Sequence, residues 1–334
     1  MRFFFKYPDF LMSIGKPMAD TQSHVSANGP RRVQSMVTGV LAGLAAGALW
    51  GLVFVAPRML PGLSAVDFTA GRYAVYGALS LLFMLLMRRA VWPTRQQAVA
   101  ALGMSVLGFT GYYLLLVFAI RDAGSEVPSL IIGTIPIWMM LLGKPAGLRW
   151  ANLLPGLGLT LLGLGLMVQT SHSQALASAS QNAGNFWRGI AFATASMLFW
   201  TVFGLLNAAW LKKHPEVSAT TWANWLGLST GLGALLLWMV AGSDLNTLLA
   251  QEQRALTAAI FIATGVGSAW LATILWNLAS QHLSPSLCGQ LIVSETIFAL
   301  FYSFVWDGHW PAPLQALACV LFAAGIVFSI RAHR

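Results

Sequence analysis

The chain has 334 residues, of which 57% are hydrophobic and only 9% are charged. Soluble domains carry roughly 25% charged residues, so this composition excludes a soluble globular protein and indicates an integral membrane protein. The formal net charge of +9 does not point to nucleic acid, because the basic residues lie singly or in pairs at the ends of apolar segments. The lipid bilayer is therefore an expected partner, and nucleic acid is not.

Residues suited to catalysis or metal binding are few and scattered. The two cysteines, Cys288 and Cys319, lie inside apolar segments, and the six histidines show no ligand spacing. The sequence contains no Walker motif, nucleophile elbow or pair of catalytic carboxylates. We therefore expect no catalytic residues, no metal and no cofactor, and neither an enzyme nor an ATP-driven pump. A membrane-embedded enzyme is the least favoured alternative.

Ten apolar segments follow a polar and basic N-terminal tail at 1–35. About 20 helical residues cross the hydrocarbon core of a bilayer, and the segments approach that length. A stretch rich in Ser, Ala and Asn at 171–187 is predicted to be a flexible linker between two halves of five spans each. The predicted spans are 36–56, 67–87, 97–120, 127–143, 151–170, 188–208, 220–241, 256–279, 287–306 and 313–330.

The distribution of positive charge predicts the orientation of the chain. If the N-terminus is cytoplasmic, most of the 19 Lys and Arg residues fall in cytoplasmic segments, which is the usual bias in membrane proteins. The even number of spans then returns the C-terminus to the same side. We therefore predict a multi-pass protein with both termini in the cytoplasm.

The two halves of the chain resemble each other. Residues 39–50 align with 189–200, residues 108–130 align with 265–287, and residues 161–168 align with 321–328, in the same order. Because five spans is an odd number, the second copy must insert with the opposite orientation. The predicted fold class is thus an all-α membrane protein with ten transmembrane helices, arranged as two inverted five-helix repeats at 36–170 and 188–331. Inverted repeats with a substrate site at their interface are typical of secondary transporters.

Short motifs within this layout resemble a known family. The chain carries GALWG at 47–51, Arg72 early in the second span, Pro136 in the middle of the fourth span and Trp200 in the second repeat. Together with the repeats, these features resemble the EamA branch of the drug/metabolite transporter superfamily over nearly the whole chain. The resemblance implies a ten-helix exporter of amino acids or other small metabolites in the bacterial inner membrane. It also implies that the fifth and tenth helices lie at the edge, where they support either a homodimer or packing within one chain.

Glu295 lies near the middle of the ninth span, where family members often carry a proline. A carboxylate at that depth costs a few kcal/mol, so it must face protein or water and not lipid. Three interpretations stay open. Glu295 binds a cationic group of the substrate, or it exchanges a proton during transport, or it is a neutral hydrogen-bonding residue that holds helices together.

Arg72 and Pro136 have two interpretations each. Arg72 lies near the outer end of its span, where an arginine either extends to the membrane interface or meets a substrate carboxylate. Pro136 removes one helical hydrogen bond near mid-membrane. It is either a hinge that exposes a backbone carbonyl to a cavity, or a packed kink whose free carbonyl is satisfied by Thr134.

Aromatic and amide residues complete the predicted substrate-binding site. Trp50 and Trp200 occupy equivalent repeat positions, as do Tyr113 and Trp270. Two symmetric pairs can wall a central cavity, although large rings also fill bundle cores or face lipid. The polar side chains expected to join this site are Asn224, Asn277, Gln290 and Ser294.

The sequence therefore predicts a secondary transporter that works by alternating access around a midplane cavity. The substrate is predicted to be a small molecule exported from the cell, with amino acids as the leading class and hydrophobic or cationic drugs as the alternative. An Arg72 that faces the cavity favours a substrate carboxylate, whereas Glu295 alone there favours a cation. Proton antiport, exchange and facilitation all stay open.

Overall fold

The computed structural model describes residues 29–60, 62–86, 91–123, 126–181, 183–249, 253–308 and 310–333. Across these ranges all regular structure is helical and no strand is present. The all-α fold class is therefore confirmed for the described residues. Most of the predicted N-terminal tail, at 1–28, lies outside them, and the first helix begins at Gly29, ahead of the predicted first span.

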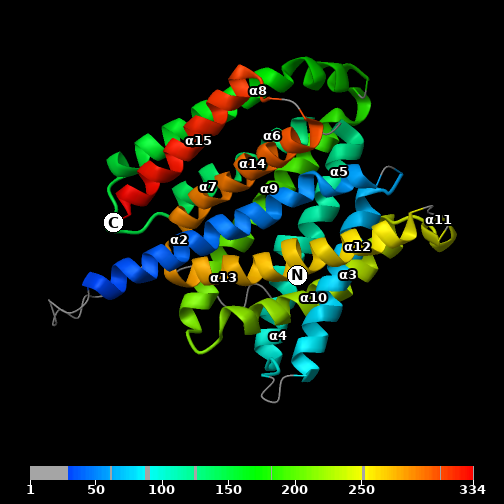
Figure 1. Cartoon of the computed structure of the whole chain (residues 1–334), viewed down its shortest axis with the longest axis horizontal. Helices are drawn as coiled ribbons and strands as arrows, with labels where there is room; N and C mark the ends of the chain where they lie inside the picture. Colours follow the sequence, from blue (N-terminus) through cyan, green and yellow to red (C-terminus); the bar gives the residue numbers. More distant parts are fainter. Residues whose placement is uncertain are drawn as a thin grey trace.

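The elements are numbered along the chain, and most of them are labelled in Figure 1. The α-helices are α2 (Gly29–Gly51), α3 (Ala65–Leu86), α4 (Arg95–Ser105), α5 (Gly111–Ala123), α6 (Glu126–Ile132), α7 (Ile135–Leu142), α8 (Trp150–Gln181), α9 (Ala183–Lys213), α10 (Ala219–Ala241), α11 (Leu245–Leu249), α12 (Arg254–Thr264), α13 (Ala272–His282), α14 (Pro285–Asp307) and α15 (Pro313–Ala332). The shorter segments are the 3₁₀-helices η2 (Leu52–Phe54) and η3 (Ala56–Met59) and the π-helices η4 (Val106–Thr110) and η5 (Gly265–Leu271).

Eight helices in the described part of the chain are long and apolar enough to cross a membrane. Two of them run through a π-helix, from Arg95 to Ala123 and from Arg254 to His282. These eight helices correspond to eight of the ten predicted spans. The predicted first and fourth spans, at 36–56 and 127–143, are not among them, so length and composition do not establish ten crossings.

Neither of these two predicted spans is a single continuous α-helix over its whole length. α2 ends at Gly51, and the chain continues as the two 3₁₀-helices η2 and η3. The fourth span is divided into α6 and α7 by a turn at residues 133 and 134. Pro136 lies in the first turn of α7, the part of a helix in which a proline needs no hydrogen-bond donor.

The break before Pro136 is packed. Thr134 Oγ1 donates a hydrogen bond to the carbonyl oxygen of Ile131 at 2.7 Å, and the Pro136 side chain is buried. The carbonyl that Pro136 leaves without a helical donor is that of Ile132, four residues earlier, so the Thr134 hydroxyl bonds to the neighbouring residue and not to the freed carbonyl. The predicted hinge role would need the same residues to move.

The predicted flexible linker at 171–187 is largely helical. α8 continues to Gln181, and α9 begins at Ala183. Alanine and glutamine are good helix formers, and this local preference outweighs the serine and asparagine residues of the stretch. The prediction of a long flexible connection between the two halves was therefore wrong.

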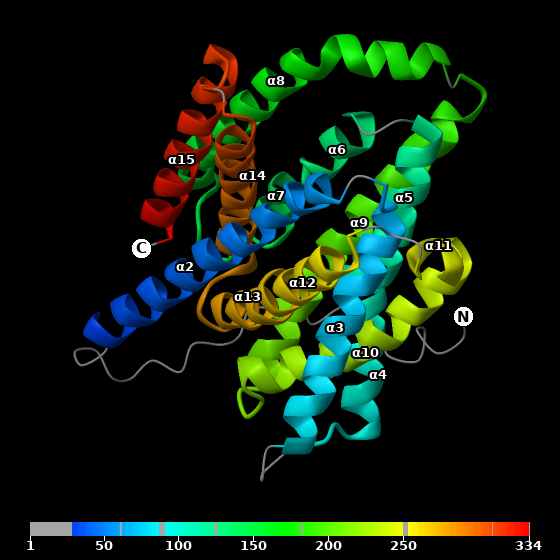
Figure 2. The same cartoon turned by 45° about the vertical axis from the view of Figure 1, so that its right-hand side comes forward.

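The contacts between helices are similar for the two halves of the chain. α3 packs against α10 and α8 packs against α15, so each of these pairs joins corresponding helices of the two halves. α5 packs against α9, and correspondingly α13 packs against α2. Figures 1 and 2 show α8 and α15 side by side at one edge of the bundle. α14, which carries Glu295, lies between α2, α7 and α15.

The α3–α10 crossing brings two backbones together at a pair of glycines. A Cβ atom placed on Gly77 would lie 2.6 Å from the Cα atom of Gly231, and one placed on Gly231 would lie 2.7 Å from the Cα atom of Gly77. Small residues permit this close approach between helices in membranes. The crossing therefore has no room for any side chain at either position.

We expect Gly77→Leu to prevent stable folding. Overpacking costs about 1–3 kcal/mol where neighbouring side chains can move, and here the neighbour is backbone. The thermal unfolding temperature of the detergent-solubilised protein measures the loss. Gly158→Leu is the matched control, because a Cβ atom at Gly158 has nothing within 4 Å. Equal unfolding temperatures for the two variants would contradict the prediction.

Candidate functional site

Two residues of opposite charge lie near each other inside the bundle. Arg72 is in the second turn of α3, and Glu295 is at the middle of α14. Within the described ranges no ion pair joins the two side chains. The guanidinium nevertheless lies close enough to the carboxylate to act on it electrostatically. The structure thus brings together the two charged residues that the sequence singled out.

The Glu295 side chain is partly exposed, and its carboxylate has no hydrogen-bond partner among the described residues. α2 lies directly against the backbone of α14 at this point. A Cβ atom on Gly51 would lie 3.2 Å from the carbonyl oxygen of Glu295, and one on Gly47 would lie 3.1 Å from its amide nitrogen. Since these glycines have no side chains, α2 supports the α14 backbone without covering the carboxylate from these positions.

Arg72 is held by an aromatic neighbour and keeps part of its hydrogen-bonding capacity unused. Its Nη2 atom donates to the hydroxyl of Tyr73 at 3.1 Å, and its guanidinium carbon lies 4.7 Å from the centre of the Tyr73 ring. In the part of the chain that the structure describes, the buried Nε atom has no partner. This environment favours an inward-facing cation over an arginine that extends to the membrane interface.

Two tyrosines of α5 border the charged pair. The Tyr113 hydroxyl donates to the carbonyl oxygen of Ala65 at 2.7 Å and so ties α5 to the start of α3. The Tyr112 hydroxyl has no hydrogen-bond partner among the described residues, and it lies within electrostatic range of both Glu295 and Arg72. The sequence singled out Tyr113 but not Tyr112 or Tyr73 for the site, because nothing in a helical pattern tells which of two adjacent tyrosines faces a distant carboxylate.

Three tryptophans from three helices form a cluster that the sequence predicted in part. Trp50 of α2 and Trp200 of α9 meet edge to face with ring centres 6.3 Å apart, as their equivalent repeat positions suggested. Trp276 of α13 lies 5.4 Å from Trp50 and 5.8 Å from Trp200. Trp50 and Trp200 are partly exposed. These rings supply a large aromatic surface close to the centre of the bundle.

A chain of aromatic contacts links this cluster to the charged pair. Trp200 packs against Phe203 at 5.9 Å, Phe203 against Phe109 at 5.5 Å, and Phe109 against Tyr73 at 5.9 Å. Tyr73 in turn holds Arg72. The tryptophan cluster and Arg72 are therefore joined through packed aromatic rings of the core.

Trp270 and Asn277 make hydrogen bonds to other helices of the protein. Trp270 Nε1 donates to Asn224 Oδ1 at 2.8 Å, and the indole stacks on Phe83 with ring centres 4.8 Å apart. Asn277 is fully buried and accepts a hydrogen bond from Asn207 Nδ2 at 3.1 Å. Its own amide donates to a backbone carbonyl of α10. The polar groups of both residues are thus used in packing between helices.

Gln290 and Ser294 of α14 are likewise used within the protein. Gln290 is fully buried, donates to Thr160 of α8 at 3.0 Å and accepts from Ser329 of α15 at 3.1 Å. Ser294 Oγ donates to a backbone carbonyl of its own helix at 2.7 Å. The four amide and hydroxyl residues that the sequence proposed for the cavity, Asn224 included, therefore already have protein partners.

Comparison with known proteins identifies the family. The chain is 30% identical over 310 residues to "Inner membrane protein YtfF" of Escherichia coli strain K12, an alignment that covers 89% of this chain and 96% of that protein. The model of the EamA-like transporter family matches residues 37–170. The chain belongs to the EamA-like transporter family. The resemblance seen in the sequence is therefore confirmed, and the family is one of membrane transporters.

A solved structure shares the fold of this family member. A chain described as "Crystal structure of protein" superposes with a TM-score of 0.64 at 20% sequence identity, over 87% of this chain and 97% of the other. At this identity the likeness concerns the fold alone. The helical arrangement described above therefore also occurs in a solved structure, and the substrate has to be argued from the site.

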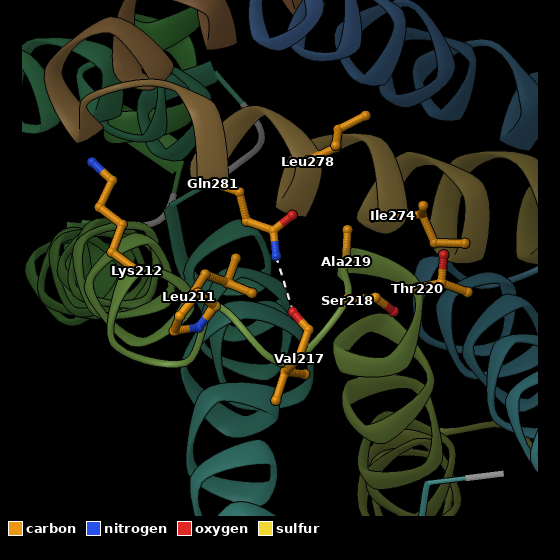
Figure 3. Close-up of a pocket in the computed structure, with 10 residues that line it drawn as sticks. Leu211, Lys212, Val217, Ser218, Ala219, Thr220, Ile274, Leu278 and Gln281 are labelled. Carbon is orange, nitrogen blue, oxygen red and sulfur yellow. Dashed lines mark hydrogen bonds between the residues drawn. The ribbon is translucent and has the colours of Figure 1, made fainter. Parts of the chain in front are cut away.

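A surface pocket of about 570 Å³ lies away from the charged pair. Figure 3 shows it between α13 and the turn that joins α9 to α10. Gln281 Nε2 donates to the carbonyl oxygen of Val217 across the pocket at 3.0 Å, and the Lys212 side chain points away from Ser218 and Thr220. This pocket of the EamA-family chain thus lies at the ends of helices and is not lined by Arg72 or Glu295.

We expect Gln290→Leu to lower stability and to leave substrate affinity unchanged. The substitution leaves Thr160 and Ser329 without their partner, and a buried polar group that loses its hydrogen bond costs about 1–3 kcal/mol. The unfolding temperature in detergent should fall, while KM measured on the folded fraction stays at the wild-type value. A raised KM with an unchanged unfolding temperature would instead place Gln290 in the substrate site.

Proposed function

We propose that this family member is a secondary transporter with ten membrane-crossing segments in two inverted repeats, at 36–170 and 188–331. The packing supports this proposal, since exchange of the two halves converts the α5–α9 pair into the α13–α2 pair and returns the α3–α10 pair to itself. The family model matches almost the same residues as the first repeat. In this arrangement α2 and the broken pair α6–α7 supply the remaining two crossings.

The proposed substrates are amino acids. The observation that carries this proposal is that one interior group of residues holds a cation and a carboxylate that are not paired with each other, Arg72 and Glu295, each with hydrogen-bonding capacity to spare. A zwitterion can satisfy both at once, with its carboxylate on Arg72 and its ammonium group on Glu295. The nearby aromatic surface of Trp50 and Trp200 suits an apolar or aromatic side chain.

Efflux of hydrophobic or cationic drugs is the second candidate. The unpaired carboxylate of Glu295 and the tryptophan cluster favour it, because cations bind both carboxylates and aromatic faces. Arg72 argues against it, since its positive charge would repel a cationic drug bound at Glu295. An amino acid would form favourable interactions with both Arg72 and Glu295. A cationic drug would interact favourably with Glu295 but would be repelled by Arg72.

Glu295 is also the proposed site of energy coupling. An unpaired carboxylate at mid-membrane binds either a proton or a substrate ammonium group, and the two compete for the same oxygens. Competition at one site is sufficient for antiport, because the carrier returns with a proton after it releases its substrate. Exchange of one amino acid for another needs no proton and uses the same site.

The proposed location is the bacterial inner membrane, with both termini in the cytoplasm. The name of the relative, an inner membrane protein, supports the location, and the excess of Lys and Arg on the predicted inner side supports the orientation. The proposed direction of transport is export. A homodimer through α8 and α15 is proposed because these two helices lie at the edge of the bundle.

Counterflow in proteoliposomes tests the proposed function. Purified protein is reconstituted, the vesicles are loaded with one unlabelled amino acid at a time, and uptake of labelled amino acid is followed with and without a pH gradient. Uptake that depends on the preloaded amino acid supports the proposal. No uptake of any amino acid, together with gradient-driven movement of a lipophilic cation that Glu295→Gln abolishes, would replace it with drug efflux.

A further inference from the structure

A group of three charged residues lies where the end of α5 meets the start of α9. Asp122 of α5 is buried, with 3% of its side chain exposed, and it accepts hydrogen bonds from two arginines. Arg188 Nε donates to Asp122 Oδ2 at 2.6 Å, and Arg121 Nε donates to Asp122 Oδ1 at 3.3 Å. Figure 2 shows α5 and α9 side by side, in agreement with the packing between them. One carboxylate therefore positions two guanidinium groups at the ends of two membrane-length helices.

Both guanidinium groups keep most of their hydrogen-bonding capacity. A guanidinium has five N–H donors, and each arginine uses only its Nε atom for Asp122. Among the described residues the terminal Nη atoms of Arg121 and Arg188 make no hydrogen bond. The two arginine side chains are 64% and 54% exposed, and two positive charges on one carboxylate leave an excess of positive charge. The group therefore presents both free donors and positive charge at the surface of the protein.

The second arginine is more than the buried carboxylate requires. A buried charge needs a partner, and the shorter contact, from Arg188, already supplies one for Asp122. Both arginines lie on the side that the charge distribution predicts to be outer, where basic residues are depleted in membrane proteins. A single arginine at the end of a span extends to the membrane interface without any specific ligand. Two arginines fixed on one carboxylate make a more defined arrangement than that.

Aromatic rings adjoin the two arginines on the side nearer to the middle of the spans. The Arg121 guanidinium carbon lies 5.0 Å from the centre of the Phe118 ring, one turn earlier in α5. Phe118 packs against Phe192 of α9 with ring centres 5.7 Å apart. Trp187, next to Arg188, is 75% exposed, and tryptophan is enriched at the level of lipid headgroups. The charged donors thus stand beside an aromatic surface that leads into the hydrocarbon region.

We propose that Arg121, Asp122 and Arg188 form a binding site for an anionic phospholipid of the outer leaflet. The lipid phosphate accepts hydrogen bonds from the Nη atoms of both arginines, because guanidinium groups match the geometry of phosphate oxygens. The acyl chains lie along Phe118 and Phe192. The excess positive charge favours phosphatidylglycerol, which is anionic, over phosphatidylcholine, whose ammonium group cancels the charge of its phosphate. The proposal does not depend on which substrate the protein transports.

Thermal unfolding of the full chain in detergent tests this lipid site. The protein is mixed with phosphatidylglycerol or with phosphatidylcholine at equal mole fractions in the micelles, and the unfolding temperature is followed as lipid is titrated. The wild type is expected to gain more from phosphatidylglycerol, because a ligand that binds the folded state stabilises it. Arg121→Gln is expected to lose this gain and to weaken phosphatidylglycerol binding by about tenfold, the effect of one charge-assisted hydrogen bond.

Three further variants separate lipid binding from a structural role of the charged group. Arg121→Lys keeps the charge without the planar donors, and it is expected to retain part of the gain. Arg188→Gln is expected to lower the unfolding temperature even without lipid, because Asp122 loses its closer partner. For this reason the gain on adding lipid, and not the absolute temperature, reports on the site. Arg254→Gln is the matched control, because Arg254 is exposed at the start of α12, and it should keep the wild-type gain.

Three outcomes would overturn the lipid site. The first is an equal gain from phosphatidylglycerol in Arg121→Gln and Arg254→Gln, and the second is an equal gain from the two lipids in the wild type. The third is a full gain from inorganic phosphate alone, which would show a site for free anions. Since none of these measurements uses transport, an error in the proposed substrate class leaves their results unchanged.

Discussion

Arg72→Ala is expected to raise KM for amino-acid counterflow by about 10- to 100-fold, because a hydrogen bond to a charged group is worth about 1.5–3 kcal/mol and each ~1.4 kcal/mol is a factor of ten in affinity. The guanidinium has an unpartnered Nε atom among the described residues, so the substrate carboxylate would complete its hydrogen bonding. Initial rates of counterflow over a range of amino-acid concentrations measure the effect.

A change in the substrate isolates the same interaction. The wild-type protein should prefer an amino acid to the amine that lacks its carboxylate, and Arg72→Ala should lose this preference. Arg254→Ala is the control, because Arg254 is exposed at the start of α12. If the variant and the wild type discriminate equally between the amino acid and its amine, Arg72 does not meet a substrate carboxylate.

Glu295→Gln is expected to abolish accumulation driven by a pH gradient while leaving counterflow measurable. The amide keeps the size of the side chain but binds neither a proton nor an ammonium group as a carboxylate does. Counterflow should persist with a KM higher by about tenfold, which corresponds to loss of one charge-assisted hydrogen bond. Uptake into vesicles with and without an imposed pH gradient measures both effects.

Glu216→Gln controls for the loss of a carboxylate as such, because Glu216 is exposed at the turn between α9 and α10. That variant should keep the gradient dependence of the wild type. Normal transport with unchanged pH dependence in Glu295→Gln would remove Glu295 from the coupling role. It would then leave the third interpretation, a hydrogen-bonding residue that holds helices together, as the remaining one.

The positions of most helices could be predicted from the apolar segments of the sequence. Errors arose where neighbouring residues favoured different local structures. The apolar segments predicted eight helices that the structure contains as membrane-length elements. The stretch at 171–187 was misassigned because serine and asparagine suggest flexibility, whereas its alanine and glutamine content favours continuation of α8 and α9. Pro136 was assigned to the correct segment, but the break falls ahead of it because proline suits the first turn of a new helix.

Site residues were harder to predict than helices. Glu295 and Arg72 could be selected from the sequence, since charged residues inside apolar spans are rare and costly. Asn277 and Gln290 looked equally suitable for a cavity, yet each is fully buried and bonded to other helices. Tyr112 was not selected, although its unpartnered hydroxyl lies near Glu295. Whether a polar side chain faces a cavity depends on its neighbours in space.

The sequence by itself determined that this protein is an all-α membrane protein, because composition and apolar segment length reflect the bilayer and not any particular contact. Its resemblance to the EamA branch came from short motifs such as GALWG at 47–51 together with the internal repeats. The tertiary structure decided which polar groups satisfy one another and which stay unpaired. That distinction depends on close approaches between distant segments, such as Gly47 with α14 and Gly143 with Ser286. Since a helical pattern specifies a face but not its partner, only the packed bundle shows that Arg72 lies within electrostatic range of Glu295.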